Sequence, residues 1–186
     1  MADGGDWSAA GHSMGASALS YLVRDEPRVQ SVVLLEPYRG SLLGGTTNGF
    51  NAFSAYSGSC LVVAGSQDLT NNAWSVVRPW FNQADAAPRN FWALINGSDH
   101  FGCTDPDVHL LWGFGSLPYA DQHRIHRRLL GGFLRSEVKG EENIFFHLLG
   151  EGMSGEPVDG ESSSFDPILW IGESSTSSNS MALGIA

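Results

Sequence analysis

The sequence predicts an α/β domain in which a mostly parallel β-sheet is flanked by helices. Short apolar runs typical of buried strands alternate along the chain with segments of helical periodicity. Parallel neighbouring strands need such a crossover between them, so the alternation favours a parallel sheet. The chain has 186 residues, of which 42% are hydrophobic, and this is enough for one substantial core.

Four segments have the β-branched or aromatic character of strands. They begin at Trp7, Val29, Cys60 and Asn90. The second, VQSVVLLEP, is apolar almost throughout, as expected for a parallel strand that is covered on both faces. We therefore expect these strands to form the centre of the sheet.

Three segments have helical patterns. Residues 14–24 carry apolar side chains on one face, and a weaker pattern over residues 73–81 contains Pro79, which disfavours a helix interior. The strongest pattern covers residues 119–136, with an apolar stripe formed by Ile125, Leu129, Leu130, Phe133 and Leu134. The predicted polar face of this helix consists of Asp121, Gln122, Arg124 and Arg128.

The chain divides into a catalytic domain, residues 1–150, and an acidic, Gly- and Ser-rich tail, residues 151–186, that we expect to be partly disordered. Within the tail, the segment FDPILWIG is apolar enough to dock as an extra strand.

Charge and hydropathy disfavour two classes of partner. The formal net charge of −10 repels phosphate backbones, so we expect no nucleic-acid partner. No apolar run approaches the roughly 20 residues that span a bilayer, so we expect no membrane span. The opening MADGGD lacks the features of a secretory signal, which leaves the localisation unknown.

The two cysteines are not expected to pair. Cys60 opens one predicted strand, whereas Cys103 follows the far end of the next, about a strand length or roughly 20 Å away. They also lack the C-x-x-C spacing of a metal or redox site.

A Gly-x-Ser-x-Gly turn, Gly11 to Gly15, joins the first predicted strand to the first predicted helix. Such a turn presents a serine hydroxyl at the edge of the sheet, and small residues on either side of the serine leave room for the chain to double back. The Met14 N–H at the helix start is a candidate oxyanion donor for a reaction at Ser13. The ordinary alternative is a strand-to-helix turn without chemistry.

An acid and a histidine follow Ser13 in the order that this motif requires. Asp68 ends the third strand in AGSQDLT, and His100 follows the fourth in INGSDHFG. The carboxyl ends of parallel strands meet at one edge of a sheet, so we expect Ser13, Asp68 and His100 to form a catalytic triad. Taken singly, Asp68 would be read as a helix cap and His100 as a loop residue.

Two other acids compete for the role of Asp68. Glu36 closes the second strand in LLEPY, where some hydrolases carry their acid, and Asp99 is adjacent to His100, so that its side chain is expected to point elsewhere.

The remaining histidines are predicted to be structural. We expect His12 to pack or cap, and we expect His123 and His126 to lie on a solvated basic helix face rather than at a metal. His109 and His147 have no evident partners in the sequence.

With the motifs GHSMGAS, VVLLEPY, LVVAGSQD and NFWALINGSDHFG, the chain resembles the α/β-hydrolase superfamily. More narrowly, over about residues 7–150, it is similar to cutinase-like polyester hydrolases, including PET hydrolases, and to their dienelactone-hydrolase-like relatives. The resemblance implies the nucleophile, acid and base at Ser13, Asp68 and His100, and the oxyanion N–H at Met14. It also places Tyr38 and Phe101 as substrate-binding residues.

The resemblance covers only the C-terminal half of the family fold. The family's first four strands, the loop that supplies its second oxyanion donor and its C-terminal cysteine pair have no counterparts here. The strand from Trp7 would then be an exposed edge, so we predict a homodimer through that edge or a replacement strand beside it, built from FDPILWIG.

These observations together predict a serine carboxylic-ester hydrolase that acts on short-chain esters or polyesters and needs neither cofactor nor metal. The family resemblance also suggests secretion. Two alternatives stay open. One is a chlorophyllase- or lactone-hydrolase-like esterase with the same triad. The other is a non-catalytic hydrolase fragment or interaction module that binds a partner through its sheet edge.

Overall fold

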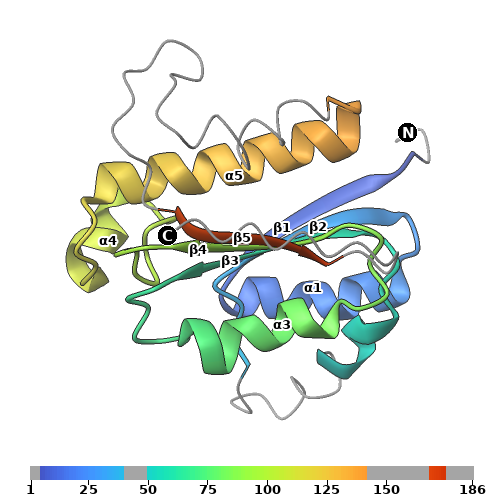
Figure 1. Cartoon of the computed structure of the whole chain (residues 1–186), viewed down its shortest axis with the longest axis horizontal. Coiled ribbons are helices and arrows are strands. Elements are labelled where there is room, and N and C mark those ends of the chain that lie inside the picture. The colour runs from blue at the N-terminus through green and yellow to red at the C-terminus, as the bar shows by residue number, and fades with distance from the viewer. Residues whose placement is uncertain (1–4, 40–49, 142–167, 175–186) are drawn as a thin grey trace.

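The structure is a computed structural model and describes residues 5–39, 50–141 and 168–174. It contains a five-stranded sheet in the order β1-β2-β3-β4-β5. Helices α1 and α3 cover one face of the sheet and α5 covers the other, so the molecule has three layers (Figure 1). The predicted class, a mostly parallel sheet flanked by helices, is confirmed.

Four parallel strands form the predicted part of the sheet: β1 (Trp7–His12), β2 (Val29–Leu35), β3 (Ser59–Gly65) and β4 (Asn90–Ile95). The fifth, β5 (Ile168–Ser174), pairs antiparallel with β4. The tail segment does contribute a strand, but the prediction that it would lie beside the strand from Trp7 is wrong. It adds to the opposite edge of the sheet.

The described helices include the three that the periodicity predicts, with two differences. They are α1 (Met14–Asp25), a π-helical turn η2 (Ala73–Val77), α3 (Arg78–Gln83), α4 (Pro106–Trp112) and α5 (Tyr119–Lys139), with a 3-10 turn η1 (Phe53–Ala55). Pro79 lies in the first turn of α3, where its missing N–H leaves no helical bond unmade. The weak pattern over residues 73–81 is therefore two short elements. The sequence did not predict α4.

Strands β2, β3 and β4 alternate their side chains between two core layers. Val32, Leu34 and Trp92 pack on the face covered by α1 and α3, whereas Val33 and Phe91 pack against α5. Nearly every residue in these three strands is buried. Burial on both faces explains the continuous apolar runs in the sequence.

Two polar residues of α5 face the core, contrary to prediction. Gln122, assigned to the polar face, is fully buried, and His126, assigned to a solvated basic face, is 2% exposed. Both share the helical spacing of Ile125 and Leu129, so they point toward the sheet. The physical reason is that partners on neighbouring loops satisfy these polar groups, as described below.

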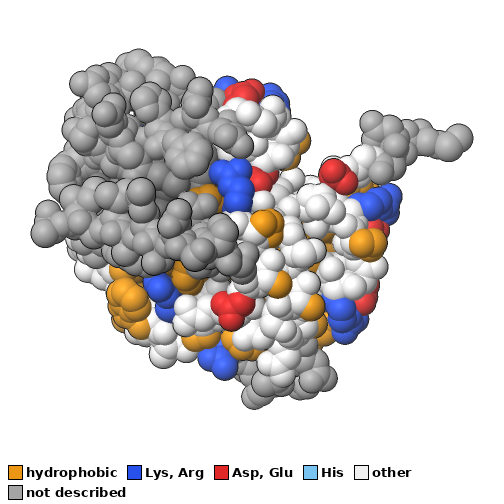
Figure 2. All heavy atoms as spheres, turned by 45° about the vertical axis from the view of Figure 1, so that its right-hand side comes forward, with side chains coloured by type: hydrophobic (Ala, Val, Ile, Leu, Met, Phe, Trp, Pro, Cys, Tyr) orange, Lys and Arg blue, Asp and Glu red, His pale blue; other side chains and the backbone are white. Residues whose placement is uncertain are grey.

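Both cysteines are free, as predicted, with Cys60 buried and Cys103 half-buried. Across the described ranges no helix is long and apolar enough to cross a bilayer. On the face shown in Figure 2, the described acidic and basic side chains are interspersed. Charge on that face therefore does not single out a binding surface.

The open edge of β1 predicts self-association. Among the described strands, β2 is its one neighbour, and Trp7 at its start is 40% exposed. Unpaired N–H and C=O groups on such an edge can pair with another chain. We expect sedimentation velocity to show mass increasing with protein concentration, and Ala10→Lys, which adds a charge at an exposed edge position, to reduce it. A monomer at every concentration would contradict this prediction.

Candidate active site

Ser13 lies on a strained turn between β1 and α1. Its backbone has φ 54° and ψ −119°, a conformation that residues with a Cβ rarely adopt. The Ser13 N–H donates to the Leu35 carbonyl at 2.9 Å, so the turn begins where the β1–β2 ladder ends. Strain of this kind persists only where surrounding contacts impose it, and it is common at functional sites.

The two glycines of the turn play different parts. A Cβ at Gly11 would lie 2.7 Å from the Gly15 carbonyl group and the Ala16 nitrogen, so only glycine allows the start of α1 to approach β1 this closely. A Cβ at Gly15 would meet no described atom within 4 Å. The expectation that both glycines supply room is therefore correct for Gly11 and wrong for Gly15.

The structure brings together Ser13, His100 and Asp68, which come from three different strand ends. His100 Nε2 lies 2.9 Å from Ser13 Oγ, and His100 Nδ1 lies 2.8 Å from Asp68 Oδ2. Asp68 and His100 are almost fully buried. These contacts have the distances expected for a nucleophile, a base and an orienting acid.

Hydrogen bonds define the tautomer of His100. A carboxylate only accepts, so Nδ1 carries the proton and donates it to Asp68, which leaves Nε2 of the neutral ring to accept from the Ser13 hydroxyl. The other oxygen of Asp68 accepts from the N–H groups of Thr70 and Asn71 at 2.8 and 2.7 Å. Both carboxylate oxygens of Asp68 therefore accept hydrogen bonds.

The other predicted site residues lie around this group. Met14 begins α1, where the first N–H groups of the helix have no partner within the helix, and its side chain is 56% exposed. The Tyr38 N–H donates to the Ser13 carbonyl at 3.2 Å, which ties the segment after β2 to the turn. The ring of Phe101 meets that of His100 edge-on, with centroids 5.1 Å apart.

The Asp99 carboxylate has hydrogen-bond partners other than the His100 ring. Its carboxylate accepts from the N–H groups of Phe101, Phe114 and Gly115 and pairs with His109 Nε2 at 3.1 Å. Burial alone would raise the pKa of Asp99, but the backbone donors outweigh burial and lower the pKa. Asp99 is therefore engaged elsewhere, as expected, and His109, which has no evident partner in the sequence, has one in the structure.

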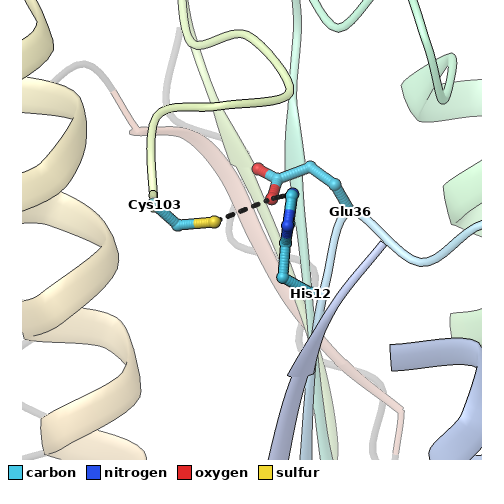
Figure 3. Close-up of side chains that lie close together, drawn as sticks. All are labelled: His12, Glu36 and Cys103. Atoms are coloured by element: carbon cyan, nitrogen blue, oxygen red, sulfur yellow. Dashed lines mark hydrogen bonds and ion pairs between the residues drawn. The ribbon is translucent and has the colours of Figure 1, made fainter. Parts of the chain in front are cut away.

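Glu36 is fully buried and lies behind the turn, in a polar cluster that the sequence did not predict. Its side chain lies between His12, which is at the end of β1, and Cys103, which is in the loop after β4 (Figure 3). Cys103 Sγ is 3.7 Å and His12 Nε2 is 3.8 Å from Glu36 Oε2, and His126 Nε2 is 2.9 Å from Oε1. The helical spacing of His126 with Ile125 is the signal that could have revealed its inward orientation.

The protonation of the two histidines in this cluster follows from their partners. Burial lowers the pKa of His12, with the Glu36 charge opposing it only in part, so the ring is neutral. For His126, burial also acts to lower the pKa, but Glu36 outweighs it and raises the pKa. Both ring nitrogens of His126 face acceptors, Glu36 Oε1 and the Gln122 carbonyl, so both carry protons. His126 and Glu36 therefore form a buried ion pair.

His12, Glu36 and Cys103 could also be considered as metal ligands. Their ligand atoms all lie within 4.8 Å of one another, and imidazole, carboxylate and thiolate are ligands that zinc accepts. A metal would need the thiolate of Cys103, whereas burial, followed by the charge of Glu36, raises the pKa of this thiol. Among these three residues, the Cys103 thiol donates a hydrogen bond to Glu36 Oε2 at 3.7 Å.

A separate hollow of about 440 Å³ lies at the opposite ends of the strands. Trp7, Ser31, Ser59 and Glu137 are among its lining residues, and none of Ser13, Asp68 and His100 is. The hollow is not part of the candidate site.

Comparison with models of protein families and with curated proteins gives no match. Solved structures do resemble the chain, and one is described as a predicted CIB-like hydrolase from Thermoplasma acidophilum. That structure is 16% identical, with a TM-score of 0.43, and the match covers 57% of this chain and 47% of that chain. The chain thus spans about half the length of this structure. The interpretation of the site rests on its own geometry.

Substitutions at the two glycines test the turn. Gly11→Ala places a methyl group against backbone, and we expect it to destabilise the protein by about 1–3 kcal/mol. Gly15→Ala occupies open space at the start of a helix and should be neutral or stabilising, by at most about 1 kcal/mol. The free energies of unfolding of the two variants and of the parent chain are measured by urea unfolding and compared. Equal destabilisation at both positions would contradict the described turn.

Proposed function

We propose that the chain is a serine hydrolase of the α/β-hydrolase type that cleaves carboxylic esters. The single observation that carries this proposal is the pair of hydrogen bonds at His100, which joins Ser13 on one side to Asp68 on the other. The strained turn at Ser13 supports it, because it presents the hydroxyl at the edge of the sheet.

In this reaction the Ser13 hydroxyl attacks the ester carbonyl carbon while His100 Nε2 takes the hydroxyl proton. Asp68 keeps Nδ1 protonated and stabilises the imidazolium that forms. His100 then returns the proton to the leaving alcohol, and an acyl group remains on Ser13. His100 next takes a proton from a water molecule, which attacks the acyl-enzyme. His100 gives that proton to Ser13 Oγ as the acyl–oxygen bond breaks, and the acid is released.

The oxyanion of each tetrahedral intermediate requires hydrogen-bond donors. The Met14 N–H is suited to this role because it directly follows Ser13 and lies in the first turn of α1, where the helix dipole also favours negative charge.

The proposed substrates are short-chain esters or polyesters with apolar groups, as in cutinase-like enzymes. Exposed apolar side chains directly follow two members of the site: Met14 after Ser13, and Leu69, which is 85% exposed, after Asp68. Exposed apolar groups beside a nucleophile favour an apolar acyl or alcohol group over a charged one. Tyr38 and Phe101 are the proposed substrate-binding residues.

Ser13→Ala tests the nucleophile with p-nitrophenyl butyrate as substrate. We expect the parent chain to release p-nitrophenol and the variant to lose at least about 10³-fold in kcat, because no acyl-enzyme can form. Ser54→Ala, a substitution of an exposed serine in η1, serves as the matched control and should retain the parent rate. A folded parent chain that is no faster than Ser13→Ala would favour the interaction-module alternative.

Asp68→Asn tests the acid. An amide cannot hold His100 in the reactive tautomer, so we expect kcat to fall about 10³- to 10⁴-fold. The matched control is Asp121→Asn on α5, whose carboxylate is 37% exposed and pairs with Arg124. Steady-state kinetics of both variants at one pH are sufficient, and equal kcat values for the two would exclude Asp68 as the acid.

A further inference from the structure

The buried residue Glu36 is connected to the segment that carries Asp68. Its backbone N–H donates to the Val63 carbonyl of β3 at 2.9 Å, and its backbone carbonyl accepts from Asn71 Nδ2 at 2.7 Å. The Asn71 N–H in turn donates to Asp68 Oδ1 at 2.7 Å. One residue, Asn71, therefore links Glu36 to the candidate acid.

The Glu36 carboxylate is also connected to the other two members of the site through His12. His12 Nε2 lies 3.8 Å from Glu36 Oε2 and donates to the backbone carbonyl of His100 at 2.7 Å. His12 immediately precedes Ser13 in the chain. The ring of His12 therefore lies between the buried carboxylate and the backbone of the candidate base.

Helix α5 holds the same carboxylate from the other side. His126 donates to Glu36 Oε1 at 2.9 Å. Its neighbour one turn earlier, Gln122, accepts at Oε1 from the Ser98 hydroxyl and the Asp99 N–H, which belong to the loop that carries His100. The same helix therefore contacts both Glu36 and that loop.

The backbone of Glu36 has an uncommon conformation. Its φ is 44°, and Glu36 and Ser13 are the two residues other than glycine with positive φ in the described part of the chain. A side chain with a Cβ adopts this region only where its surroundings require it. Full burial, a backbone bond at each end and donors to both carboxylate oxygens supply that requirement.

We propose that Glu36 is a positioning residue for the Ser13–His100–Asp68 group. It holds the segments after β1, β3 and β4 so that the three side chains stay within hydrogen-bond distance, and it acts through His12, Asn71 and the ion pair with His126. This inference rests on the proposed function. Glu36 is not the catalytic acid, because Asp68 occupies Nδ1 of His100 and other groups engage both oxygens of Glu36. A buried carboxylate with directed donors keeps one position, because any shift would leave a charge unpaired.

Glu36→Gln removes the charge and retains the shape of the side chain. We expect kcat on p-nitrophenyl butyrate to fall about tenfold to 100-fold, since small misplacements of reacting groups have effects of this size, with KM changed less than twofold.

Glu137→Gln is the matched control. Glu137 is also a nearly buried glutamate in an ion pair, with Arg89 at 2.7 Å, but it lies near the end of α5, in the hollow at the far ends of the strands. The substitution should lower stability and leave kcat and KM unchanged. Equal kinetic effects of Glu36→Gln and Glu137→Gln would overturn the positioning role.

The double variant Glu36→Gln/His126→Gln separates positioning from stability. Removing both charges leaves no unpaired ion, so we expect thermal stability to recover relative to Glu36→Gln. We expect kcat to stay low, because His12 still lacks its carboxylate partner. Recovery of kcat together with stability would show that Glu36 acts through stability alone and would overturn the proposal.

A measurement without turnover distinguishes this inference from the proposed function. In proton NMR, the His100 Nδ1–H that donates to Asp68 should give a downfield resonance that exchanges faster in Glu36→Gln than in Glu137→Gln. If the parent chain does not hydrolyse esters and Ser13 does not react with a fluorophosphonate, the proposed function fails, and the NMR comparison still decides the positioning role. An unchanged resonance in Glu36→Gln would overturn it.

Discussion

The hydrogen bond from the Ser13 N–H to the Leu35 carbonyl is the contact on which the candidate site depends most directly. It follows the last β1–β2 pair, at the residue where the chain turns into α1, and Ser13 has positive φ at this point. At Gly11 the start of α1 approaches β1 so closely that there is no room for a Cβ. The direction of the Ser13 hydroxyl is therefore a consequence of sheet pairing and backbone sterics, not of the side chain itself.

Parallel pairing then brings the partners of Ser13 to the same edge. β1, β2, β3 and β4 are neighbours and run in one direction, so the segments that follow them emerge together. Asp68 follows β3 and His100 follows β4, which lets one imidazole reach both the hydroxyl and the carboxylate. The loops need additional support at this edge, because loops carry fewer backbone bonds than strands.

The buried polar groups behind the edge provide that support. Asp99 organises the loop after β4 through three backbone donors and His109, while Glu36 joins β2, β3 and α5. Each carboxylate is stable in the interior only because directed donors replace the water that it has lost. These two acids are the ones that competed with Asp68 in the sequence, and the structure gives both of them other partners.

The sequence by itself determined the strands, the two longest helices, the position of the turn and the identity of the three residues that meet there. Apolar periodicity, glycine spacing and the order of residues along parallel strands are local properties, and local sterics and burial act on them directly. The tertiary structure alone decided which edge β5 joins, that Gly15 has room for a side chain, and that Gln122 and His126 turn inward. These outcomes depend on partners distant in sequence, because a polar side chain enters a core only where another segment supplies its hydrogen bonds.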